Sequence, residues 1–243
     1  MQDKLLYRQL IPIYLVVFIG FLGYSLTLTV FTPMILHHHG YVRMHLSPSW
    51  RAVLLGIILC CYPLGQFIGT PIIGALSDRF GRRPILLATL TLTTLFYTLI
   101  ALSLEAKQLP WLGLACFCTG LCEGNVAIAQ SAIADKTPKK DRNRLFGYIY
   151  MFASTAYIIG PLVGGELANF SRHPTLTYAT PFWMMFFILI LVTVSTYFGF
   201  KETKDHPETN VHYLSAFTNL SKVFTDKKLR VFYAINFMLY LSI

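Results

Sequence analysis

The sequence predicts an all-α, polytopic membrane protein: a six-helix bundle made of two inverted repeats of three helices, followed by the start of a seventh helix. Hydrophobic residues make up 55% of the 243 positions and charged residues only 13%, whereas a soluble domain has about a quarter charged residues. Apolar runs of about 20 residues, the length that crosses a bilayer, recur along the chain. Because lipid satisfies no backbone hydrogen bonds, such runs must be helices. They lie at 10–36, 52–76, 84–104, 110–135, 145–169 and 181–200, and a seventh begins near Val231.

Basic residues gather on alternate connecting segments. The N-terminus, the 77–83 and 136–144 loops and the tail after residue 200 together hold 16 of the 20 Lys and Arg residues. Cytoplasmic loops are enriched in these residues. We therefore expect the N-terminus on the cytoplasmic side of a plasma (inner) membrane. The net charge of +9 then reflects the membrane topology. The basic residues are spread over short loops between helices, which argues against nucleic-acid binding.

An internal repeat relates two segments of fourteen residues. PIIGALSDRFGRRP (71–84) and PLVGGELANFSRHP (161–174) share Pro, Gly, Phe, Arg and Pro at a constant offset of 90 residues. The first copy ends the second span and the other ends the fifth span, so the two copies leave the bilayer on opposite sides. Inverted repeats of three helices are a recurring plan in secondary transporters, with the transport site near the midplane.

The loop between the second and third spans reads GALSDRFGRRP (74–84). Its glycines allow a tight turn and a close approach of helices. Asp78 can accept N–H bonds from a neighbouring helix N-terminus. We expect Arg82 to pair with Asp135 at the end of the fourth span, as a latch for one conformation. The alternative is that the arginines only set the topology. The motif residues are Gly74, Asp78, Arg79, Gly81, Arg82 and Arg83.

This loop resembles the signature between helices two and three of the major facilitator superfamily. CYPLGQFIGTPIIG and GLCEGNVAIAQSAIAD are similar to helices two and four of its drug:proton antiporter branch, the tetracycline- and multidrug-efflux type. The fifth span is similar to the antiporter motif of that branch, except that Ala156 replaces a glycine. The matching residues are Gly147, Gly160, Pro161, Gly164 and Gly165. The resemblance implies the major facilitator fold, and it implies that Asp78 engages helix eleven of a second half.

Glu123 is the acidic residue nearest the middle of a span. An ionisable residue inside a span is a functional candidate by default. Helical spacing places Cys116, Gly120, Glu123, Ala127 and Gln130 on one face. We propose proton exchange at Glu123, and the alternative is a protonated side chain that joins two helices. Many antiporter relatives have an acid near Gly20 or Tyr24 and an arginine at the position of Cys116, and both are absent here.

The predicted substrate cavity is polar but weakly charged. Its candidate residues are Tyr24, Gln66, Gln130 and Tyr157, beside Glu123. Asn125 points away from the Glu123 face by helical phase, which favours a packing role. Aromatic and amide groups suit small lipophilic compounds.

No enzymatic pattern and no resident cofactor are expected, with the proton as the coupling ion. The triplet His37–His39 favours a solvated loop over a metal site. The five cysteines lie in predicted spans and match no zinc pattern.

Three parts are expected along the chain: residues 1–200 as the bundle, 201–230 as a cytoplasmic linker with an amphipathic helix, and 231–243 as a truncated seventh span. We therefore expect the first half of a proton-coupled exporter in the lipid bilayer, which needs a second six-helix half, either another chain or a second copy. The alternatives are a non-transporting scaffold and a nutrient or metabolite carrier of the same superfamily.

Overall fold

The computed structural model describes residues 2–36, 47–167, 176–203 and 231. Every regular element among them is an α-helix. Six helical stretches in this part of the chain are long and apolar enough to cross a bilayer, which confirms the predicted spans. The helices are α1 (Gln2–Leu36), α2 (Pro48–Phe80), α3 (Arg82–Glu105), α4 (Leu109–Cys122), α5 (Asn125–Lys136), α6 (Lys139–Leu167) and α7 (Thr180–Gly199).

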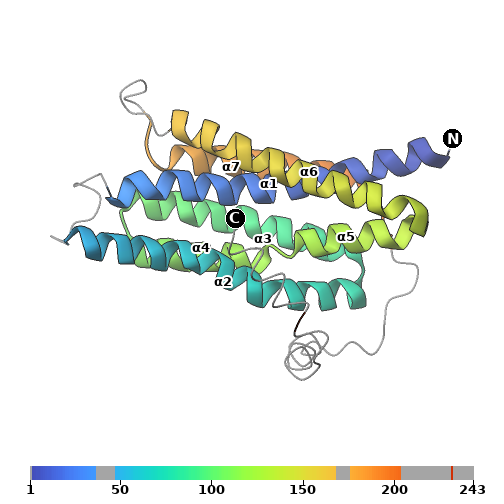
Figure 1. The fold of residues 1–243 in the computed structure, drawn as a ribbon, viewed down its shortest axis with the longest axis horizontal. Helices are drawn as coiled ribbons and strands as arrows, with labels where there is room; N and C mark the ends of the chain where they lie inside the picture. The colour runs from blue at the N-terminus through green and yellow to red at the C-terminus, as the bar shows by residue number, and fades with distance from the viewer. Residues whose placement is uncertain (1, 37–46, 168–175, 204–230, 232–243) are drawn as a thin grey trace.

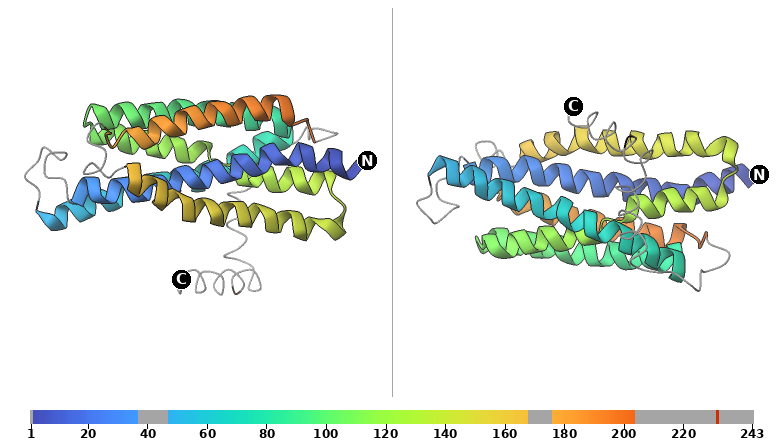
Figure 2. Two further views of the ribbon diagram at one scale, coloured as in Figure 1. Left: turned by 90° about the horizontal axis from the view of Figure 1, so that it is seen from above. Right: turned by 60° about the horizontal axis from the view of Figure 1, so that its bottom comes forward.

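The helices lie side by side along the long axis of the molecule, as Figures 1 and 2 show. α4 and α5 form one span with a break at Glu123 and Gly124. We call the end of the bundle that holds the α2–α3 and α5–α6 connections the motif end, and it is also where α1 starts and α7 finishes (Figure 1). The opposite end holds the α3–α4 connection.

Helix contacts follow a reciprocal pattern. α2 packs mainly on α4, and α1 packs mainly on α6; α3 packs on α4 and α7, and α1 also packs on α7. If spans one to three correspond to spans four to six, the α2–α4 contact is equivalent to the α1–α6 contact, and the α3–α4 contact is equivalent to the α1–α7 contact. An inverted repeat of three spans produces this reciprocity. The end of the second sequence copy, residues 168–174, lies outside the described residues.

Two predicted loops are much shorter in the structure. α2 continues through Phe80 and α3 begins at Arg82, so the predicted 77–83 loop reduces to Gly81. The predicted 136–144 loop reduces to Thr137 and Pro138. The charged residues of these segments therefore lie in helical turns at the motif end. The predicted linker and seventh span lie outside the described residues, apart from 201–203 and Val231.

The core is apolar and centred on α1, whose side chains from Leu10 to Ile35 are largely buried. α2, α6 and α7 expose many large apolar side chains, among them Phe67, Ile158 and Phe198. In a membrane these faces meet lipid or another helical unit, since lipid tails are as apolar as the side chains.

Candidate functional site

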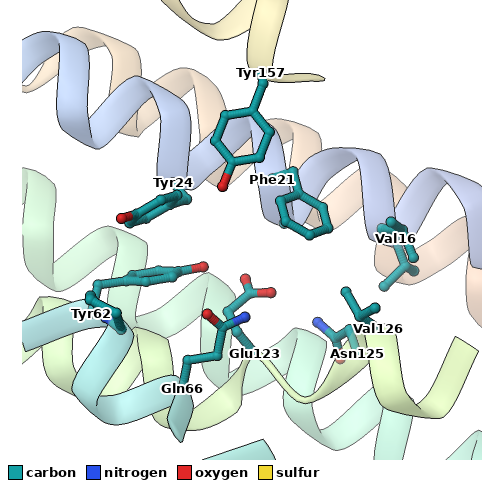
Figure 3. A pocket seen from close by; sticks show the side chains of 12 residues that line it. Val16, Phe21, Tyr24, Tyr62, Gln66, Glu123, Asn125, Val126 and Tyr157 are labelled. Atoms are coloured by element: carbon teal, nitrogen blue, oxygen red, sulfur yellow. The ribbon is translucent and has the colours of Figure 1, made fainter. Parts of the chain in front are cut away.

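A cavity of about 240 Å³ opens between α1, α2, α6 and the α4–α5 break. Its lining residues come from near the middle of each of these spans. Figure 3 shows tyrosines from three helices, with Glu123, Gln66 and Asn125 facing them. Glu123 is the one carboxylic acid among the described residues that line the cavity. The bundle therefore holds an acidic, aromatic cavity at mid-bilayer depth.

The position of Glu123 results from the break in the fourth span. Its backbone adopts φ −83° and ψ 38°, outside the helical range, and its N–H bonds to the carbonyl oxygen of Gly120 at 3.0 Å. Gly124 fits close to α2, because a Cβ added there would be 2.5 Å from Cγ2 of Ile73. The break turns the chain between α4 and α5. The predicted single face that joins Glu123 to Gln130 is therefore wrong.

The carboxyl group of Glu123 packs against the backbone of α1. A Cβ added to Gly20 would be 2.7 Å from Oε2 of Glu123, so the absence of a side chain at Gly20 leaves the space for the carboxyl group. Glu123 is 4% exposed. The resemblance indicates an acid on this part of α1 in many relatives. Here the carboxyl group reaches the same helix from the fourth span.

Tyrosine side chains from three helices also line the cavity. The hydroxyl of Tyr62 donates a hydrogen bond to the carboxyl group of Glu123. The ring of Tyr24 stacks on that of Tyr62 with centroids 4.8 Å apart, and it meets the ring of Tyr157 edge-on at 6.3 Å. Tyr24 and Tyr157 lie where the sequence placed them. Tyr62 was not predicted, although its position one turn before Gln66 could have indicated it.

The amide candidates divide into two groups. Gln66 lines the cavity, and so does Asn125, which the sequence assigned to packing. Asn125 is also held by α3, since the hydroxyl of Thr89 donates to its Oδ1 at 2.9 Å. Gln130 is not among the cavity residues. Its Nε2 donates to the hydroxyl of Tyr150 at 3.3 Å, because α5 starts a new helical phase after the break.

A charge network occupies the motif end. Nε of Arg82 lies 3.2 Å from Oδ2 of Asp135, and Nη2 lies 2.7 Å from Oδ1 of Asp78. Nη1 donates to Oγ of Ser77 at 2.6 Å. Arg82 is 5% exposed, whereas Asp135 and Asp78 are partly exposed, so the structure brings the predicted pair together at the edge of the buried region. The planar guanidinium group has donors pointing in several directions, so it contacts Asp135, Asp78 and Ser77 at once. The compact ammonium group of a lysine is less suited to this.

Glu202, after α7, is a member of this region that sequence reasoning missed. Its Oε1 accepts a bond of 2.9 Å from the backbone N–H of Arg82, and its Oε2 accepts one of 3.0 Å from Arg83. We predicted that Asp78 accepts N–H bonds from a neighbouring helix N-terminus. At the start of α3 Glu202 accepts such bonds, and Asp78, one turn before Arg82, pairs with the side chain of Arg82.

The remaining motif arginines contact aromatic rings. The guanidinium group of Arg79 lies 5.2 Å from the ring centroid of Phe80. Arg83 lies 5.3 Å from the ring centroid of Tyr197 and donates to its carbonyl oxygen at 2.7 Å. Arg83 therefore joins the start of α3 to the end of α7, beside Glu202.

The motif glycines are not equivalent. Gly81 has φ 98°, and a Cβ there would be 2.6 Å from Oε2 of Glu202. Gly74 has no atom within 4 Å of an added Cβ, so the predicted close approach does not occur there. On α6, Gly160 and Gly164 pack against α1, whereas Gly147 and Gly165 face open space. Pro161 lies inside the continuous helix α6.

Comparison with known proteins places this bundle in a family. The family model of the Major Facilitator Superfamily matches residues 13–243. The chain is 35% identical to the tetracycline resistance protein, class B, of Escherichia coli over 64% of its length, and 28% identical to multidrug resistance protein 2 of Bacillus subtilis (strain 168) over 87%. The matches span 37% and 48% of those relatives' own length.

A solved structure has the same fold. The human organic anion transporter MFSD10 (TETRAN) superposes on 81% of the chain with a TM-score of 0.67 and 21% identity, and the match covers 48% of that transporter. With six apolar spans, a charge network at the α2–α3 turn and a family match over nearly its whole length, the chain is an integral, multi-pass membrane protein that belongs to the Major Facilitator Superfamily.

Proposed function

We propose that the chain is one half of a proton-coupled exporter of small lipophilic compounds, in which Glu123 carries the proton. The observation that carries this proposal is the position of Glu123, a buried carboxyl group at the break of the fourth span that faces a cavity at mid-bilayer depth. A carboxyl group is expensive to bury in a membrane and is typical of proton relays. Burial favours its neutral form, and access to water allows it to ionise.

The chemistry of the cavity supports a lipophilic substrate. The tyrosine rings offer apolar and π surfaces, and the amides of Gln66 and Asn125 offer donors and acceptors. Such a lining, with a few polar groups among aromatic ones, is typical of small-molecule sites. The names of the relatives, which describe resistance to tetracycline and to multiple drugs, support export as the direction.

Transport would require a second six-helix half. The chain matches about half or less of its relatives' length, and alternating access moves two units around a central site. The second half would be another chain or a second copy. The basic motif end would face the cytoplasm, with the membrane being the plasma (inner) membrane. The network around Arg82 would then latch one of the two states.

Proton-coupled flux in proteoliposomes tests the proposal. Vesicles holding the chain, alone or with a second six-helix half, enclose a pH-sensitive dye, and tetracycline is added outside. Inward movement of tetracycline should drive protons out and raise the internal pH in the two-half vesicles. Glu123→Gln should abolish this pH change. Glu105→Gln is the matched control, because Glu105 lies at the opposite end and accepts a bond from Trp183.

Each outcome separates the alternatives. Loss of proton movement in Glu123→Gln alone supports the exporter. Tetracycline flux that continues in Glu123→Gln with unchanged proton movement would return Glu123 to a structural role. Flux without any proton movement in the unmodified protein would favour an uncoupled carrier. Absence of flux in every vesicle would favour a non-transporting scaffold.

A further inference from the structure

The hydroxyl of Tyr97, in the middle of α3, is buried without a hydrogen-bond partner among the residues that the structure describes. Tyr97 is 1% exposed, and its ring stacks with that of Phe182 at a centroid distance of 6.3 Å. A buried hydroxyl that bonds to nothing is unfavourable and calls for a physical explanation. In the interior of a membrane protein, water offers no easy substitute.

The fold keeps space for this hydroxyl on α1. A Cβ added to Gly23 would overlap the hydroxyl oxygen of Tyr97 and lie 3.1 Å from Cε of Met185. Any other residue at Gly23 would therefore displace the hydroxyl. The absence of a side chain at Gly23 holds the phenol group against α1 at this depth.

The neighbouring turn of α1 holds the carboxyl group of Glu123 in the same manner. Gly20 lies three residues before Gly23, and an added Cβ there would be 2.7 Å from Oε2 of Glu123. Cβ positions three residues apart on a helix are about 5–6 Å from each other and on the same face. The carboxyl group of Glu123 and the hydroxyl of Tyr97 therefore occupy sites on adjacent turns of α1.

We propose that Tyr97 is the second hydrogen-bond donor of ionised Glu123. In the present state the carboxyl group bonds to Tyr62, and the hydroxyl of Tyr97, one turn of α1 away, has no partner among the described residues. When Glu123 releases its proton to water in the cavity, the carboxylate accepts a bond from each tyrosine. The inference rests on the proposed proton exchange at Glu123 and identifies the groups that stabilise its ionised form at this depth.

The other described groups around Glu123 are neutral at pH 7. Tyr62 of α2 already bonds to the carboxyl group, Cys122 precedes Glu123 in its own span, and Tyr24 and Tyr157 line the same cavity. The amides of Gln66 and Asn125 line it too and carry N–H donors, while Oδ1 of Asn125 accepts from Thr89. No cation is among these groups. Hydrogen bonds to charged groups are the strong ones, so a second phenol donor has a large effect here.

Infrared titration of the purified protein in nanodiscs tests the inference. Glu123→Gln identifies the carboxylic C=O band of Glu123, and the band is followed with pH. Tyr97→Phe keeps the ring and removes the donor, so the charged form loses a bond and the titration midpoint should rise by about one to two pH units. Gly23→Ala, which displaces the hydroxyl from another helix, should also raise it. Tyr14→Phe is the control, because it removes a buried hydroxyl that bonds to Leu145.

A raised midpoint in Tyr97→Phe and Gly23→Ala, with no change in Tyr14→Phe, supports the inference. An unchanged midpoint in Tyr97→Phe overturns it while leaving proton exchange at Glu123 intact. A band in the unmodified protein that never titrates overturns the proposed proton carrier and the role of Tyr97 with it. Should Tyr97→Phe fail to fold, Gly23→Ala decides by the same criterion.

Discussion

Oε1 of Glu202 lies 2.9 Å from the backbone nitrogen of Arg82 and accepts its hydrogen bond. The first N–H groups of a helix have no partner within the helix, and the helix N-terminus carries partial positive charge. Glu202 therefore satisfies two N–H groups of α3 with a carboxylate from the segment after α7. The side chain of Arg82 extends to Asp78 and Asp135, so the first residue of α3 is bonded through both its backbone and its side chain.

Glu202→Ala should lower the free energy of unfolding by about 1 kcal/mol, the usual effect of losing an N-terminal cap. Glu202→Gln should lose less, because its amide oxygen still accepts one bond. The measurement is reversible unfolding by sodium dodecyl sulfate in mixed micelles. Lys201→Ala is the control, because Lys201 is an exposed neighbour. Equal stability of Glu202→Ala and Lys201→Ala would show that the cap contributes nothing.

Gly160→Ala should destabilise the bundle, whereas Gly147→Ala and Gly165→Ala should not. A Cβ at Gly160 would be 2.6 Å from Cβ of Ser25 on α1, and such overpacking typically loses about 1–3 kcal/mol. Gly147 and Gly165 have nothing within 4 Å of an added Cβ, so alanine there should be neutral or stabilising, by up to about 1 kcal/mol.

All three glycines lie in α6, so the host helix is constant. Thermal unfolding of the three variants, followed by tryptophan fluorescence, measures the difference. Three equal midpoints would mean that α1 and α6 can separate freely at Gly160, contrary to the packing described.

The spans and the pairing of Arg82 with Asp135 could be predicted from the sequence. The spans depend on local apolar length, and the pairing depends on which helix ends lie on the same side of the membrane. An arginine and a carboxylate at helix ends on the same side of the bundle attract each other. Glu202 could not be found this way, since it lies 120 residues from Arg82 and belongs to a polar stretch without a pattern.

The break at Glu123 was missed for a different reason. A single glycine inside an apolar run does not predict that the helix is interrupted. The close approach of Ile73 to Gly124, which is visible only in the structure, explains why a residue without a side chain is needed at the break. Helical phase was therefore extended across a point where the helix stops. This one error moved Gln130 into the predicted site and Asn125 out of it. The role of a glycine is also hard to predict from the sequence, because it depends on which atoms of another helix lie against it.

Gly20→Ala should change the surroundings of Glu123 while leaving the fold intact. An added Cβ would be 2.7 Å from Oε2 of Glu123, and because that oxygen ends a flexible side chain, the carboxyl group should move rather than the backbone of α1. The space available to it is the cavity. The unfolding free energy should change by less than about 1 kcal/mol, since alanine also favours the helix.

Reaction with a hydrophobic carbodiimide, which modifies protonated carboxyl groups, reports this movement. Mass spectrometry should find Glu123 modified several-fold faster in Gly20→Ala than in the unmodified protein, because the displaced group is more accessible from the cavity. Gly74→Ala is the matched control, with no atom within 4 Å of the added Cβ, and its rate should not change. An unchanged rate in Gly20→Ala would mean that α1 does not confine the carboxyl group, and the adjacent sites of Glu123 and Tyr97 on this helix would lose their basis.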